Sequence, residues 1–312
     1  MAGVRRSRTR SALLGLVILL VNASIVVAVV AFSGHRPTDG IELPPSIRKQ
    51  GTAGTATSSI PPTESPSSKA AAAPGELAAA DRPVTLAVLG DGTGDENGEW
   101  VQVLARMLGE THRVTIRGLD RSDPTRYTGA EKFGSKGPTA TIWNGSRRGA
   151  SADYAARRLE FLVPTPPDAV LLSYGRDDTA SNIGEQLSTT YTAVRSKWPT
   201  ASVLVVLQAP DRDDLIGPVR LAAENWAASE QLPTVDVAHA FANAGDPNRF
   251  VSVEDPPSVN SKGGRLWART VLAALGADVS TFPDNGALPE KWATAPSGAE
   301  ANDPASATGN RG

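Results

Sequence analysis

The chain of 312 residues contains no cysteine. It therefore forms no disulfide bond, offers no thiolate ligands to a structural zinc ion and has no cysteine nucleophile. This absence does not place the protein in the cytosol, because exported proteins can also lack cysteine.

The chain also lacks an excess of basic charge. Its 31 Lys and Arg residues nearly balance its 33 Asp and Glu residues, which gives a formal net charge of −2. Binding to the nucleic-acid backbone normally needs a basic surface, so we expect no nucleic-acid partner. Aromatic residues make up only 5% of the chain, whereas 29 Gly and 24 Pro are present. Part of the chain is therefore expected to lie outside any packed core.

The N-terminal region combines a basic start with an uncharged apolar stretch. Four arginines lie within residues 1–10, and residues 11–33 are rich in Leu, Val, Ile and Ala. About 20 such residues suffice to cross a bilayer as a helix, and the arginines should stay on the cytoplasmic side. We predict a basic cytoplasmic tail, a signal-anchor helix over 11–33 and a single-pass protein at the cell membrane, with its domain on the extracytoplasmic side. The alternative is a signal peptide cut near Ala31-Phe32-Ser33, which would release a secreted protein.

Two segments lack any hydrophobic periodicity. Residues 34–82 are rich in Ser, Thr, Pro and Ala and offer almost nothing to bury. Ordering them would cost about 1–2 kcal/mol of backbone entropy per residue, so we predict a disordered stalk. Residues 279–312 have a similar composition and are expected to be a largely disordered tail, in which only Leu288, Trp292 and their neighbours could pack on the domain.

Residues 83–278 alternate between short apolar runs and helical patterns, which predicts one α/β domain. The expected strands are 84–89, 113–117, 139–143, 169–174, 202–207 and 234–237. The expected helices follow near 100–108, 151–162, 181–198, 214–231 and 261–275. This order favours a three-layer α/β/α sandwich with a mostly parallel, flavodoxin-like sheet.

Four polar turns follow strands or precede the last helix, where a parallel sheet places its site. They are Gly90-Asp91-Gly92, Asn144-Gly145-Ser146, Gly175-Arg176-Asp177-Asp178 and the segment from Asp255 to Asn260. In order and spacing these turns resemble the SGNH/GDSL hydrolase family, in particular its membrane-anchored or secreted actinobacterial type. The resemblance covers residues 83–275 and implies the fold of an esterase, lipase or carbohydrate deacetylase.

The resemblance assigns a role to each turn, and most of the reactive groups are missing. The family's serine nucleophile corresponds to Gly92, its oxyanion-hole glycine to Gly145 and its oxyanion-hole asparagine to Asp177. Its Asp-x-x-His motif corresponds to Asp255 and Ser258, so the general base is absent. The sequence therefore predicts a catalytically inactive member, kept for binding or cell-envelope scaffolding.

An active esterase or deacetylase with relocated residues is the alternative. Thr93 or Ser258 could then act with His239, whereas His35 lies in the stalk and His112 starts a strand. We expect no cofactor, since the first turn lacks the full glycine pattern of a dinucleotide site. Possible ligands are a cell-envelope glycan or an acylated molecule.

A weaker alternative is a metal or cation site made by carboxylates near the same cleft. Asp91, Asp177, Asp178 and Asp255 are its candidates. Oxygen-rich clusters of this kind suit Ca²⁺ or Mg²⁺. However, aspartates in turns often bond their own backbone instead.

Overall fold

The computed structural model describes residues 73–96, 98–254 and 258–293. Its centre is a seven-stranded sheet with the strand order β3-β2-β4-β1-β5-β6-β7, in which only β3 runs antiparallel. The strands are β1 (Val84–Gly90), β2 (Arg113–Gly118), β3 (Glu131–Phe133), β4 (Thr139–Asn144), β5 (Ala169–Ser173), β6 (Ser202–Leu207) and β7 (Thr234–Asp236).

Five of these strands, in the order β4-β1-β5-β6-β7, have the flavodoxin-like arrangement expected from the sequence. All residues of β5 and β6 are buried, because helices cover both faces of the sheet at its centre. The antiparallel strand β3 lies within a stretch for which the sequence predicted no strand. It is short and mostly exposed at the sheet edge, so its residues carry no apolar pattern.

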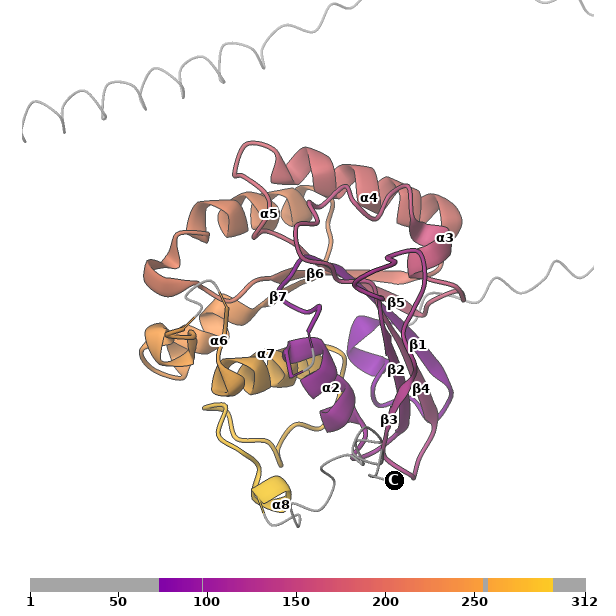
Figure 1. Ribbon diagram of the computed structural model, residues 1–312, viewed down its shortest axis with the longest axis vertical. Coiled ribbons are helices and arrows are strands. Elements are labelled where there is room, and N and C mark those ends of the chain that lie inside the picture. The colour runs from indigo at the N-terminus through magenta and orange to yellow at the C-terminus, as the bar shows by residue number, and fades with distance from the viewer. Residues whose placement is uncertain (1–72, 97, 255–257, 294–312) are drawn as a thin grey trace, which may run out of the picture. The chain divides into compact units, whose positions relative to one another are not determined.

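Figure 1 shows helices on both sides of the sheet, which confirms the three-layer architecture. On one face α2 (Trp100–Leu108) packs against α7 (Ser261–Ala274), beside α6 (Val237–Asn243). Trp100 and Trp267 stack there with ring centroids 5.4 Å apart, and both side chains are buried. The other face carries α3 (Leu159–Leu162), α4 (Ile183–Lys197) and α5 (Gly217–Ser229), which pack over a second apolar core.

The helix expected over 151–162 is mostly a series of turns, with α3 as its last part. The reason lies in Ala152, whose N–H donates to Asp178 Oδ1 (3.1 Å) and whose carbonyl accepts from Thr190 Oγ1 (2.6 Å). The Thr190 side chain thus uses a carbonyl group that a regular helix would bond internally, while Asp178 holds the N–H of the same residue. As a result, this segment is tied to the turn after β5.

The folded part extends beyond both predicted boundaries. Before residue 83, Leu77 is buried in the core next to a short 3-10 helix (Pro74–Glu76). After residue 278, Phe282 is buried, and Trp292 in α8 (Glu290–Ala293) donates to Glu110 Oε1 (2.8 Å). The packing of Trp292 agrees with the expectation that this part of the tail could lie on the domain, and the residues around Leu77 and Phe282 extend the packed region a few residues past the predicted bounds.

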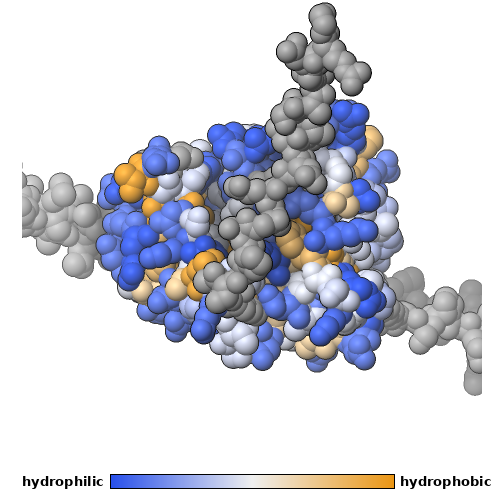
Figure 2. Space-filling view, turned by 60° about the horizontal axis from the view of Figure 1, so that its bottom comes forward, coloured by the Kyte–Doolittle hydropathy of each residue, from blue (hydrophilic) through white to orange (hydrophobic). Residues whose placement is uncertain are grey.

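The predicted anchor over 11–33, with the rest of 1–72, lies outside the described residues, as does 294–312. Among the residues that are described, no helix is both long and apolar enough to span a membrane. The face of the molecule in Figure 2 is mainly hydrophilic, and its apolar residues lie in small separate patches.

Candidate functional site

The first turn after β1 is organised by Asp91, which is completely buried. Its Oδ1 accepts from Thr93 N (3.0 Å) and Thr93 Oγ1 (2.9 Å). Its Oδ2 accepts from Arg176 N (2.9 Å) and Gln208 Nε2 (2.8 Å). Asp91 thus links the ends of β1, β5 and β6 through four hydrogen bonds.

Burial and hydrogen bonding act in opposite directions on this carboxyl group. Burial raises the pKa of Asp91, while the bonds from Arg176, Gln208 and Thr93 lower it and leave the pKa above its usual value. Gln208 was not identified from the sequence, since it stands after a buried strand with no motif around it. Its amide also donates to Ser173 O (3.1 Å), which ties β6 to β5 at the same point.

Gly92 occupies the position that the resemblance assigns to the nucleophile, and the space beside it is full. A Cβ atom added to Gly92 would lie 3.0 Å from Arg148 Cα, 3.2 Å from Arg148 Cβ and 3.3 Å from Arg148 Cγ. A side chain at position 92 would therefore need the segment at residue 148 to shift by a few tenths of an ångström. The segment is held in place by Arg148 N, which donates to Asp95 Oδ2 (2.8 Å), and by Arg147 N, which donates to Gly90 O (3.0 Å).

The oxyanion-hole positions are also occupied by internal bonds. The N–H of Gly145 donates to Val88 O (2.8 Å), so it is not free to bind a ligand. The N–H that faces Asp177 belongs to Gly149, and it donates to Asp177 Oδ2 at 3.2 Å. Gly149 has φ of +76°, a conformation that glycine adopts readily. The sequence did not single out Gly149, because only the tertiary contact with Asp177 marks it.

The last motif falls partly outside the described residues. Asp255 is not among the described residues. Ser258 accepts a long hydrogen bond from Arg176 Nη1 (3.4 Å), which brings the third turn next to the segment before α7. A guanidinium group thus faces the position that would hold the family's histidine.

Thr93 and His239, which the sequence offered as replacements for the missing nucleophile and general base, lie at separate places. The hydroxyl of Thr93 is bonded to Asp91, and the residue is 7% exposed. His239 lies in α6 and lines another cavity, together with Asp211 and Asp236. Its backbone N–H donates to Asp236 Oδ1 (2.8 Å), so it lies beyond β7, whereas Thr93 follows β1.

The acidic side chains bind backbone N–H groups rather than facing one another as ligands. Asp178 Oδ1 accepts from Ala152 N, and burial raises the pKa of Asp178 to about 6, with a further contribution from nearby Asp91 and Asp177. Within the part of the chain that the structure describes, no group of three or more acidic or histidine residues is arranged to hold a metal ion. The proposed carboxylate cluster is therefore not formed by its three described members, and Asp255 lies outside.

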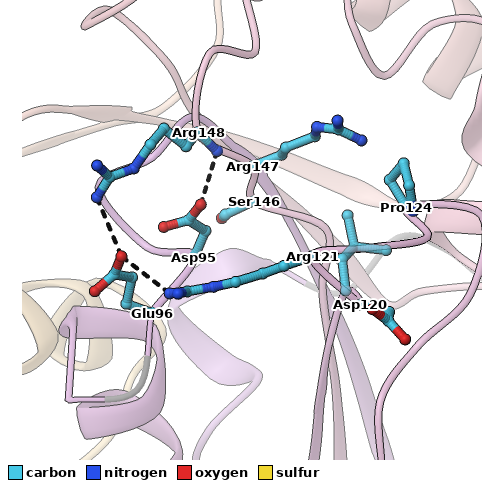
Figure 3. Close-up of a pocket in the computed structure, with 9 residues that line it drawn as sticks. Asp95, Glu96, Asp120, Arg121, Pro124, Ser146, Arg147 and Arg148 are labelled. Atoms are coloured by element: carbon cyan, nitrogen blue, oxygen red, sulfur yellow. Dashed lines mark hydrogen bonds and ion pairs between the residues drawn. The ribbon is translucent and has the colours of Figure 1, made fainter.

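A cavity of about 370 Å³ lies next to Arg148, on the side of β4 and β2. Figure 3 shows the residues that form its wall, with Glu96 ion-paired to Arg121 (2.9 Å) and to Arg148 (3.1 Å). Close by, Glu99 precedes α2 and accepts from Glu96 N (2.8 Å). Burial, with a smaller contribution from the neighbouring carboxylates, raises the pKa of Glu99 to about 7.

Among the comparisons with known proteins, only the comparison of structures finds proteins similar to this chain. No protein-family model and no curated protein matches the sequence. Of 59 matching chains of solved structures, a lipase/acylhydrolase from Enterococcus faecalis has 19% identity and a TM-score of 0.45, over 62% of this chain and 96% of that chain. A member of the lipolytic protein G-D-S-L family from Veillonella parvula has 15% identity and a TM-score of 0.43, over 61% and 96%. A two-domain esterase active on acetylated mannans has 17% identity and a TM-score of 0.47, over 64% of this chain and 50% of that chain.

Proposed function

We propose that this chain is a membrane-anchored, SGNH/GDSL-hydrolase-like protein of the cell envelope that binds a ligand without hydrolysing it. The observation that carries the proposal is the contact between Gly92 and the backbone of Arg148. A nucleophile needs a side chain, and a side chain at this position would have to displace the backbone of Arg148. If a single serine had been lost from an otherwise open site, the space beside Gly92 would be empty.

Two further observations support the loss of catalysis. The N–H of Gly145 donates to Val88 O, and the carboxylate of Asp177 accepts the N–H of Gly149, so neither mapped position offers a free donor to an oxyanion. An ionised carboxylate at that place would also repel the negative charge that develops during acyl transfer. Each factor of ten in rate corresponds to about 1.4 kcal/mol of transition-state stabilisation, so the loss of several groups together removes most of the rate.

An active hydrolase with relocated residues has less support. It would need Thr93 or Ser258 beside a general base, but Thr93 already donates to Asp91 and Ser258 faces Arg176. The one histidine considered for the role, His239, lines a separate cavity. The geometry therefore favours binding or scaffolding over acyl transfer.

The test uses the full-length protein with short p-nitrophenyl esters, acetylated sugars and a fluorophosphonate probe. We expect no turnover above the buffer blank and no labelled Ser or Thr, while an active GDSL esterase serves as positive control. Turnover or labelling that disappears in Thr93→Ala or Ser258→Ala would contradict the proposal and identify the relocated nucleophile.

The membrane anchor is tested separately, by fractionating cells that express the full chain or a chain without residues 1–33. We expect the full chain in the membrane fraction, with its C-terminal part accessible to protease from outside. Recovery of the full chain in the medium, with an N-terminus after residue 30, would instead identify a cleaved signal peptide.

A further inference from the structure

One face of the sheet is left open over β3, β2 and β4. On the side of α3, α4 and α5, the apolar core of the described chain contains buried residues of β1, β5 and β6, but none of β2, β3 or β4. Figure 1 shows α4 and α5 next to β6 and far from β3. Parallel strands are normally covered on both faces, so the open part at β2 and β4 is unusual for this architecture.

The side chains of β2 and β4 alternate between the packed face and this open face. Val114 and Ile116 of β2 are buried on the side of α2 and α7. Thr115, which lies between them, points to the open face, where it is paired in register with Thr141 of β4 and Lys132 of β3. These three residues are exposed or half-buried and form one row across the three strands.

Three cations lie on the open face, one in this row and the others before and after it along β2. Arg113 and Arg117 each lie two residues from Thr115 and so stand about 13 Å apart, with Lys132 about 5 Å away on the neighbouring strand. Arg117 also lies over the ring of Trp143, 5.9 Å from its centroid. In the described part of the chain, none of the three cations forms an ion pair.

The acidic residues near this face do not balance the cations. In the described strands β1 to β4, the one acidic residue is Glu131, which is paired in register with Ile116 and so points to the packed face. It accepts a hydrogen bond there from Gln102 Nε2 (2.7 Å). Next to the start of β1, Asp168 is already ion-paired with Arg82 (2.8 Å). The open face thus favours a partner that supplies negative charge.

The size and charge of the open face argue against a second copy of this chain as the partner. Two such faces would bring cations against cations, which is repulsive. The face measures about 13 Å along β2 and about 10 Å across β3, β2 and β4. A stable interface between folded proteins buries about 800 Å² on each partner, so the face suits a short segment instead.

An extended acidic segment matches the spacing of the cations. In such a segment every second side chain lies on one face, about 6.6 Å apart, which is the repeat of Arg113, Thr115 and Arg117 in β2. Carboxylates at three alternate positions can therefore reach Arg113, Lys132 and Arg117 in turn. Each guanidinium can donate two hydrogen bonds to a carboxylate, and the hydroxyls of Thr115 and Thr141 can donate to further oxygens of the segment.

We propose that the open face of β3, β2 and β4 binds a short, extended segment of a partner protein that carries an acidic side chain at every second position. Arg113, Lys132 and Arg117 supply the charge, and Thr115 and Thr141 supply hydroxyl groups. None of the positions that the resemblance maps to catalysis lies in these strands. The proposal therefore goes beyond the proposed function and holds whether or not the chain hydrolyses esters.

The experiment measures binding of fluorescein-labelled peptides to the full-length protein in an uncharged detergent, by fluorescence polarisation. The probe peptide alternates Glu and Thr, and a matched peptide has Gln in place of each Glu. A third peptide has the composition of the probe but carries its Glu residues in one block. We expect the alternating acidic peptide to bind about tenfold more tightly than the Gln peptide and about threefold more tightly than the block peptide.

Substitutions on the open face locate the binding. Arg113→Gln, Lys132→Gln and Arg117→Gln should each weaken binding of the alternating peptide about threefold, and the triple variant should weaken it by about tenfold or more, because exposed ion pairs contribute little singly and more together. Arg212→Gln and Lys262→Gln are matched controls that remove the same charge elsewhere, after β6 and in α7. Both controls should keep the affinity of the unaltered chain.

The proposal is overturned if the alternating peptide does not bind, if the Gln peptide binds as tightly, or if the triple variant keeps the affinity of the unaltered chain. Equal or tighter binding of the block peptide would refute the alternating spacing. Tighter binding of inorganic polyphosphate, added as a competitor, would show that the face takes a phosphate polymer rather than a protein segment. The comparisons between peptides use the unaltered chain, so they decide the question even if the triple variant does not fold.

Discussion

A substitution of Gly92 by alanine gives a sharp test of how the first turn is filled. Gly92 is buried, and its φ is not in the positive range that favours glycine. In an open position of this kind, Gly→Ala stabilises a protein by about 0.4–1 kcal/mol, because it restricts the unfolded chain. An added Cβ here would instead lie 3.0 Å from Arg148 Cα, closer than carbon atoms normally approach.

The contact cannot be relieved by turning a flexible side chain, because the nearest atom belongs to the backbone. Moving Arg148 would stretch its bond to Asp95 and its ion pair with Glu96. Overpacking of this kind costs about 1–3 kcal/mol, so Gly92→Ala should destabilise the protein by about that amount. For a folded domain of this size, we expect the melting temperature to fall by about 2–12 °C.

The assay is urea unfolding followed by tryptophan fluorescence, with Gly129→Ala as a matched control. Gly129 has nothing within 4 Å of an added Cβ, so this control should be neutral or slightly stabilising. In a double-mutant cycle, Arg148→Gly should recover part of the loss in Gly92→Ala, because it removes the contacts at 3.2 and 3.3 Å but not the one at 3.0 Å. A Gly92→Ala protein as stable as the unaltered chain, or more stable, would refute the filled-site interpretation.

Three further predictions concern stability, each measured by urea or thermal unfolding. Asp91→Ala should cost about 3–5 kcal/mol, because it leaves buried donors without their acceptor; a loss below 1 kcal/mol would contradict the central role of this carboxylate. The raised pKa values of Asp178 (about 6) and Glu99 (about 7) mean that the folded state binds these protons more tightly, so stability should fall as pH rises from about 4 to 7. Asp178→Asn and Glu99→Gln should each reduce that fall, and an unchanged pH profile would refute the assignment. Trp292→Ala should cost about 1–2 kcal/mol, because it removes the contact of the Arg106 guanidinium, 4.1 Å from the ring centroid, and the bond to Glu110; no change would mean that the C-terminal segment adds nothing to the fold.

The central strands could be predicted from the sequence because burial on both faces leaves a direct pattern. β5 and β6 are continuous apolar runs that end at polar turns, and their observed bounds agree with the expected ones within a residue. β3 could not be found in this way, since a short edge strand needs no apolar face. The packing of Leu77 and Phe282 could not be found for a related reason, because single apolar residues create no periodic signal.

The candidate site was predictable in its location but not in its contacts. The turns after β1, β4 and β5 do meet, since the carboxyl ends of parallel strands lie at one edge of the sheet. The role of Gln208 and the contact between Gly92 and Arg148 join residues far apart in the chain. No spacing rule covers such pairs, and the bond between Gly149 and Asp177 is another contact of this kind.

The contacts around Arg148 join two of the positions to which the resemblance assigns catalytic groups. Its backbone fills the space beside Gly92, and its N–H is held by Asp95. One residue further, Gly149 is bound to Asp177, so the same loop also closes the oxyanion-hole position. A serine at position 92 would therefore need the loop to move, whereas an asparagine at position 177 could keep the bond, because its amide oxygen also accepts an N–H. Because Gly92 and Asp177 both contact the same short segment, a serine introduced at position 92 alone should strain this loop.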